Sequence, residues 1–174
     1  MLSKIRYYVN RKILHQLYYS IIYPFLTYGL SIWGNTYSST LKPLITLQKR
    51  AIRTITFSKP DEHSEPLFKE LEILKLTGLV TLHNALLMYH YYYNLLPSSF
   101  ENFFQSVASV HSYNTRLASK STYYINTIKT NYGKFNIRFA AVKVWNHLEE
   151  SIKHLPLKTF KNKVKLNILQ SYCS

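Results

Sequence analysis

The sequence is poor in the residues that catalytic and metal centres require. Its 174 residues include eight acidic side chains, only one of them an aspartate, together with one cysteine and four scattered glycines. Polymerases and nucleases that use two metal ions need several converging carboxylates. A single cysteine excludes an internal disulfide and a cysteine-based zinc site. We therefore expect no catalytic residues, metal site or cofactor in this chain, and a reducing location, cytoplasmic or nuclear.

Positive charge is abundant and unevenly distributed. There are 22 Lys and Arg residues against 8 Asp and Glu, and the formal net charge is +14. Residues 1–60 carry nine cations and no acid, residues 61–101 carry six acids and two cations, and residues 102–174 carry eleven cations and two acids. Two basic regions flanking an acidic one indicate a groove or two contact surfaces for phosphate.

A tyrosine-rich segment between residues 14 and 34 predicts a helix with one apolar stripe. The stripe consists of Leu14, Leu17, Tyr18, Ile21, Phe25, Tyr28 and Ile32. Pro24 predicts a bend, and Gly34 can end the helix. Residues 13–33 carry no charge, so a membrane span is an alternative. Four tyrosines, several polar side chains and positive flanks on both sides disfavour it.

A basic helix is predicted over Leu41 to Arg53, with a capping residue near Ser39 and Pro43 in the first turn. Its buried side is expected to carry Leu44, Leu47, Ala51 and Ile55. Its outer side carries the first candidate contact surface for nucleic-acid phosphates: Lys42, Lys49, Arg50 and Arg53. A solvated helix face is the alternative, but such faces normally mix charges of both signs.

The remaining pattern is also mainly helical. Apolar spacing predicts helices near residues 67–74, 77–93, 100–104 and 141–151 and from residue 157. The aromatic run from Tyr89 to Asn94 is expected to lie partly in the core and partly on the helix surface, and base stacking is the alternative. Residues 134–139 alternate apolar and polar side chains and predict a strand with a cationic outer face. A second candidate phosphate-contact surface comprises Arg116, Lys120, Lys134 and Arg138.

These patterns predict a mainly α fold with three regions. Residues 1–57 form a helical subdomain, residues 58–106 a helical connector, and residues 107–174 a basic C-terminal extension that is a small α+β part with one short strand and terminal helices.

Eight segments in order resemble the C-terminal part of the reverse transcriptase of non-LTR (LINE-type, jockey-like) retrotransposons. They are LYYSIIYPFLTYGLSIWG (17–34), LQKRAIRTI (47–55), EPLFKELEILKL (65–76), LPSSF (96–100), YNTR (113–116), TNYGKFNIRF (130–139), VWNHL (144–148) and FKNKVK (160–165). They span nearly the whole chain, and together they are far more specific than any one of them.

The resemblance implies that Leu14 to Ile55 is the helical thumb, which grips the primer–template duplex behind the active site, and that residues 1–57 form a thumb-like subdomain. In that family the fingers and the palm, with its catalytic aspartates and Mg²⁺, lie before the region matched here. The chain is accordingly expected to be a noncatalytic fragment of an RNA-directed DNA polymerase. Its expected partners are an RNA/DNA hybrid or duplex and, if present, the upstream fingers and palm.

Two other interpretations stay open. The chain could be a nonfunctional relic of a decayed element. It could also be a structural or interaction protein whose basic helix contacts partners or an anionic membrane surface.

Overall fold

The computed structural model describes residues 2–110 and 122–173, and the predicted mainly α fold is confirmed for these residues. The first elements are α1 (Leu2–Ile5), α2 (Arg11–Leu17), the π-helical turn η1 (Tyr18–Ile22), α3 (Tyr23–Thr27), α4 (Leu30–Trp33), α5 (Ser38–Thr56), α6 (Ser64–Glu70) and α7 (Leu76–Tyr92). The 3₁₀ turn η2 (Ser98–Phe100), α8 (Val107–Val110), the 3₁₀ turn η3 (Gly133–Phe135), α9 (Ile137–His147), α10 (Glu150–Lys153), α11 (Leu157–Gln170) and the 3₁₀ turn η4 (Ser171–Cys173) follow.

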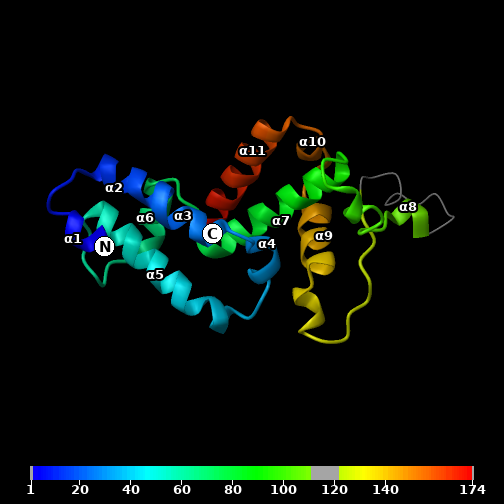
Figure 1. Cartoon of the computed structure of the whole chain (residues 1–174), viewed down its shortest axis with the longest axis horizontal. Helices are drawn as coiled ribbons and strands as arrows, with labels where there is room; N and C mark the ends of the chain where they lie inside the picture. Colours follow the sequence, from blue (N-terminus) through cyan, green and yellow to red (C-terminus); the bar gives the residue numbers. More distant parts are fainter. Residues whose placement is uncertain (1, 111–121, 174) are drawn as a thin grey trace.

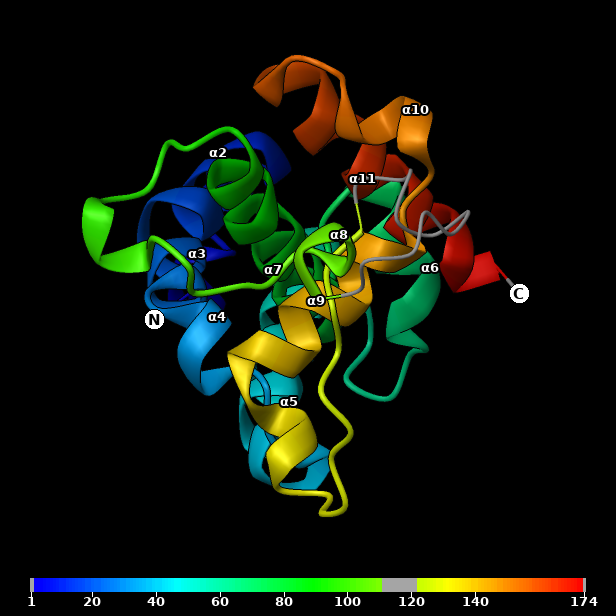
Figure 2. The same ribbon diagram turned by 90° about the vertical axis from the view of Figure 1, so that its right-hand side faces the viewer.

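The helix α7 is the centre of the larger of two hydrophobic cores. It packs against α4, α9 and α11, and Figures 1 and 2 show these helices around it. Trp145 of α9 and Phe160 of α11 are fully buried in this core beside Leu79 and Met88 of α7. Because α7 is apolar on most of its circumference, it can be covered from several sides at once.

The smaller core lies at the N-terminal end of the molecule. It joins α1, α2, η1 and α6 to the second half of α5, through residues such as Leu14, Phe68, Ile52 and Ile55. The first half of α5 contributes Leu41 to the larger core instead. The helix α5 therefore belongs to both cores, which fixes its position along its whole length.

The tyrosine-rich segment folds into α2, η1, α3 and α4, and its buried stripe differs from the predicted one. Phe25, Tyr28 and Ile32, which the sequence placed inside, are 81%, 84% and 80% exposed. Leu26 and Leu30 are buried in their place. The π-helical turn is one reason, because it adds a residue to the turn and shifts the register of the side chains of α3.

A second irregularity interrupts this segment at Gly29. Its φ angle of 60° lies in the left-handed region, which glycine enters without steric cost, and it separates α3 from α4. None of the helices in the described residues combines the length and the apolar character needed to cross a membrane.

The strand predicted over residues 134–139 is wrong. This stretch forms η3 and the start of α9, and Asn136 caps α9 by accepting a hydrogen bond from the backbone N–H of Arg138 at 2.9 Å. A strand needs a neighbouring backbone to pair with. In residues 2–110 and 122–173 β pairing is limited to one isolated bridge between Ser106 and Tyr123, so the α+β character predicted for the C-terminal part is not observed.

The aromatic run at the end of α7 lies partly in the core and partly at the surface, as predicted: Tyr89 is buried, and Tyr93 is 38% exposed. The rings of Tyr89 and Tyr92 contact Phe160 and Trp145, with centroid distances of 4.6 and 5.5 Å. Tyr91 contacts Phe104 at 4.8 Å. These rings are therefore occupied by core contacts rather than presented for base stacking.

The division into three regions stays a prediction. The structure shows which helices of the three regions pack against one another. The helix α6, which belongs to the predicted connector, completes the smaller core of residues 1–57. The helix α7, from the same connector, packs mainly against α9 of the C-terminal extension.

Candidate nucleic-acid interface

The helix α5 presents the four cations of the first candidate surface along its solvent-facing sides. Lys42, Lys49 and Arg53 are separated by seven and four residues and lie within about 20° of one line along the helix, while Arg50 projects about 80° to one side. Lys42 and Arg50 are exposed, and Lys49 and Arg53 are half-buried. The four side chains thus form a ridge with one offset member.

The buried side of α5 is rotated from the predicted one. Leu41, Gln48, Ile52 and Ile55 are buried, whereas Leu47 is 58% exposed. Leu47 and Phe25 line a groove of about 520 Å³ between α5 and the η1–α3 segment, and Arg50 lies at this groove. The helix itself begins at Ser38, one residue before the predicted cap, and Tyr37 makes no side-chain capping bond.

The acidic stretch after α5 folds back onto the second half of its cationic ridge. The Nε of Arg53 donates a 2.8 Å hydrogen bond to the main-chain oxygen of Glu62. Lys75, which is ion-paired with Glu65, lowers the pKa of that carboxyl, and Lys49 adds a smaller effect in the same direction. The single-signed charge predicted from the helix alone is therefore partly compensated at Lys49, while Arg53 is hydrogen-bonded to a main-chain oxygen.

The second candidate surface is described only in part. Arg116 and Lys120 lie outside the described residues. Lys134 in η3 is exposed, and its Nζ donates to the Asn131 Oδ1 at 3.2 Å. Arg138 is exposed in the first turn of α9. Lys134 and Arg138 are four positions apart, and they lie on a short turn and on the start of a helix where a strand was predicted.

An aromatic contact brings the two candidate surfaces near each other. The ring of Tyr37, immediately before α5, meets the ring of Phe135 edge to face, with a centroid distance of 4.5 Å. Phe135 is the neighbour of Lys134, and Tyr37 lies five residues before Lys42. The start of α5 and the start of α9 thus approach the same region of the molecule (Figure 2).

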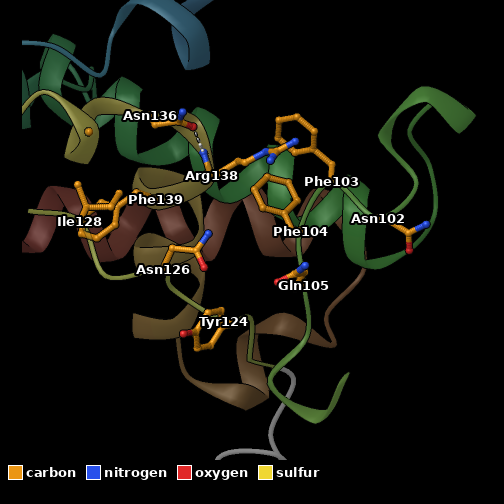
Figure 3. Close-up of a pocket in the computed structure, with 11 residues that line it drawn as sticks. Asn102, Phe103, Phe104, Gln105, Tyr124, Asn126, Ile128, Asn136, Arg138 and Phe139 are labelled. Carbon is orange, nitrogen blue, oxygen red and sulfur yellow. Dashed lines mark hydrogen bonds between the residues drawn. The ribbon is translucent and has the colours of Figure 1, made fainter. Parts of the chain in front are cut away.

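Arg138 reaches a pocket that the sequence did not predict. Its guanidinium carbon lies 4.3 Å from the centroid of the Phe103 ring, a cation–π contact. Figure 3 shows the two side chains together at the pocket, with Gln105 and Asn126 below them in that view. The pocket has a volume of about 360 Å³, and its lining comprises Asn102, Phe103, Phe104, Gln105, Tyr124, Asn126, Ile128, Gly133, Asn136, Arg138 and Phe139.

The lining comes from two parts of the sequence, residues 102–105 and residues 124–139. No periodicity relates residues 102–105 and 124–128 to the start of α9, and only the tertiary fold brings them together. The one local signal available was Asn136, because asparagine is a preferred residue at a helix N-cap.

In residues 2–110 and 122–173 no group of three or more His, Cys, Asp or Glu side chains is placed to hold a metal ion. The chemistry that the described surfaces offer is the binding of anions and planar groups by cations, amides and rings. The fold and these surfaces define a mainly helical, basic protein with a cationic helix held across two cores. Neither protein-family models, nor curated proteins, nor solved structures gave a match to the chain.

Proposed function

We propose that this chain is the noncatalytic C-terminal part of a non-LTR retrotransposon RNA-directed DNA polymerase, and that it holds the primer–template by its phosphates. The ordered segments of the sequence support the family. On its own the chain is not an enzyme in this proposal, because the palm aspartates and their Mg²⁺ belong to a region outside it. Its place would be the cytoplasm or the nucleus, where its RNA and DNA partners occur.

The observation that carries the proposal is the ridge on α5. The four cations stand on a 19-residue helix that carries no acidic residue and is packed into two cores. A helix fixed in this way presents its charges at set positions, and phosphate contacts from such positions determine register and orientation without reading sequence. Holding a duplex behind an active site requires this kind of contact.

Replacing all four cations of the α5 ridge by alanine is expected to abolish most of the affinity for an RNA/DNA hybrid. If each cation neutralises one phosphate, a plot of the logarithm of the parent's binding constant against the logarithm of the salt concentration should have a slope of about −3 to −4. The affinity of the parent should then fall about a hundredfold between 50 and 200 mM salt. Fluorescence anisotropy with a labelled hybrid at several salt concentrations measures both quantities. The variant should bind weakly and show a slope near zero.

A control variant with the same change in net charge is available on α11. Replacing Lys158, Lys161, Lys163 and Lys165 by alanine also removes four positive charges, at a helix outside the proposed interface. This variant should retain most of the affinity and the slope of the parent. If both variants lose the same affinity for the hybrid, binding depends on net charge alone and not on the α5 ridge. If log K of the parent does not change with log salt, the proposal is contradicted.

Attachment to another protein is a second candidate function, favoured by the exposed apolar side chains of α3 and α4. Phe25, Tyr28 and Ile32 are each about four-fifths exposed, and Phe25 continues into the groove with Leu47. Clustered apolar side chains in water mark interaction sites. In the parent polymerase this side would meet the upstream fingers or palm.

Replacing Phe25 and Ile32 by serine is therefore expected to reduce self-association of the isolated chain without lowering its stability by more than about 0.5 kcal/mol, because both side chains are already in water. Sedimentation velocity measures the association. Flotation with anionic liposomes, run beside it, tests membrane-surface binding. If the double variant associates as the parent does and neither preparation floats, this side of the protein is not an interaction surface.

A further inference from the structure

The Arg138 pocket is held open by hydrogen bonds from the two long helices beneath it. The Tyr91 hydroxyl on α7 donates to the backbone oxygen of Phe104 at 2.9 Å. On α9, the Asn146 side chain bonds both backbone groups of Tyr123, at 2.7 and 3.0 Å. The backbone N–H of Tyr124 then donates to the oxygen of Gln105 at 2.8 Å. The two stretches that form the walls are thus fixed before any ligand arrives.

The cation in this pocket is not neutralised by an acid. Three ion pairs are found in the described part of the chain, and they use Arg11, Lys75 and Lys153. Arg138 instead lays its guanidinium against Phe103. Stacking covers one face of the guanidinium and leaves its N–H edge available for a phosphate, which it can bind with two parallel hydrogen bonds.

The pocket also offers amide groups that are suited to a flat polar ligand. The side chains of Gln105 and Asn126 are exposed, and among residues 2–110 and 122–173 they make no hydrogen bond. Each carries a donor and an acceptor, as the edge of a nucleobase does. No acidic residue lines the pocket, and Glu101 lines the neighbouring one.

The size of the pocket favours a nucleotide of a single strand over a base pair of a duplex. A volume of about 360 Å³ is at the lower end of sites for small ligands. It can receive one nucleotide but no base pair of a duplex. A base enters such a pocket only from a strand whose bases can leave the stack, which is the usual target of aromatic and guanidinium platforms.

We propose that this pocket holds one unpaired nucleotide of a single strand, with its phosphate on Arg138 and its base between the half-buried rings of Phe103 and Phe139 and the amides of Gln105 and Asn126. The proposal rests on the nucleic-acid function proposed above and extends it. The cationic ridge on α5 holds the duplex, and the pocket takes a nucleotide of the unpaired strand. The Tyr37–Phe135 contact joins the segments that carry these two sites.

The test compares a single-stranded RNA oligonucleotide with an RNA/DNA hybrid, using the full chain. Arg138→Ala is expected to weaken single-strand binding about 10- to 100-fold, the effect of losing one stacked, charge-assisted contact, and to change hybrid binding less than about threefold. Arg138→Lys keeps the charge but loses the planar stack, so it should show most of the same loss. The double variant Gln105→Leu, Asn126→Leu should weaken single-strand binding and reduce differences among oligonucleotides of different base.

The possible results distinguish a failure of the pocket proposal from a failure of the proposed nucleic-acid function. If the hybrid binds through the α5 ridge but the single strand binds equally well to the parent, Arg138→Ala and Arg138→Lys, the pocket proposal is wrong and the proposed function stands. If Arg138→Lys binds the single strand as tightly as the parent, the site is a simple charge contact and the pocket is again excluded. If neither nucleic acid binds the parent, the proposed function fails. All three residues are exposed, so circular dichroism should show the parent fold in every variant.

Discussion

Replacing Gln48 by leucine is expected to destabilise the protein by several kcal/mol. Gln48 is 1% exposed on α5, and its amide joins three separate parts of the chain. Its Nε2 donates to the Tyr18 hydroxyl at 3.0 Å and to the Leu74 main-chain oxygen at 2.9 Å. Its Oε1 accepts from the backbone N–H of Leu76 at 2.8 Å.

The last of these bonds substitutes for a missing helix cap. The helix α7 begins at Leu76, and its N-cap residue, Lys75, makes no capping bond with its own side chain. The first N–H groups of a helix have no partner within the helix, so a side chain from α5 supplies one. Burial raises the pKa of Tyr18 to about 12, so its hydroxyl stays protonated over the accessible pH range.

The Gln48→Leu variant leaves one backbone carbonyl and one backbone N–H buried without their partner, at about 1–3 kcal/mol each. We expect a loss of about 2–6 kcal/mol in the free energy of unfolding, measured by urea titration with far-UV circular dichroism. Gln16→Leu on the exposed side of α2 is the matched control and should lie within about 0.5 kcal/mol of the parent. A Gln48→Leu variant as stable as that control would show that the buried amide contributes nothing.

Replacing Trp145 by alanine is expected to have a comparable effect through the larger core. Trp145 is fully buried on α9, and its ring contacts Tyr92 of α7 and Phe160 of α11, with centroid distances of 5.5 and 6.2 Å. It thereby connects α7, α9 and α11. The ammonium of Lys153, itself buried, lies 5.5 Å from the same ring.

Truncating a buried tryptophan to alanine costs about 3–5 kcal/mol, because apolar contact is lost and a cavity remains. For a chain of this length the melting temperature should fall by about 10 °C. Thermal unfolding by circular dichroism measures it. Tyr132→Ala, which truncates an 80% exposed ring, should leave the melting temperature unchanged within about 2 °C, and an equal change in both variants would refute the role assigned to Trp145.

The sequence predicted most of the long helices, but the predicted buried sides of α5 and of the segment after η1 differ from the observed ones. On α11 the apolar residues Phe160 and Val164 are buried and Ile168 is half-buried, because an uninterrupted helix keeps one register from end to end. After η1 and the break at Gly29 the register differs from that of one regular helix, so Phe25 and Ile32 are exposed and Leu26 and Leu30 are buried. A π-helical turn leaves no clear pattern in side-chain spacing, so periodicity alone could not place it.

For the candidate sites, too, the sequence predicted the positions within one helix but not the contacts between distant segments. Local spacing put Lys42, Lys49 and Arg53 on one line, as the structure has them. The same spacing could not show that Glu62 and Glu65 fold back beside two of these cations, nor that Arg138 lies on Phe103. Those contacts join residues brought together by loops, and the direction of a loop depends on what its flanking helices pack against.

By itself the sequence determined that the chain is mainly helical and strongly basic, with one aspartate and one cysteine. These properties follow from composition and from spacing within single helices. Only the tertiary structure decided which cations remain uncompensated, which apolar side chains of α3 and α4 stay in water, and that a pocket exists beside Arg138. Each of these depends on distances between segments far apart in the chain, and those distances are set by the packing of α5, α7 and α9.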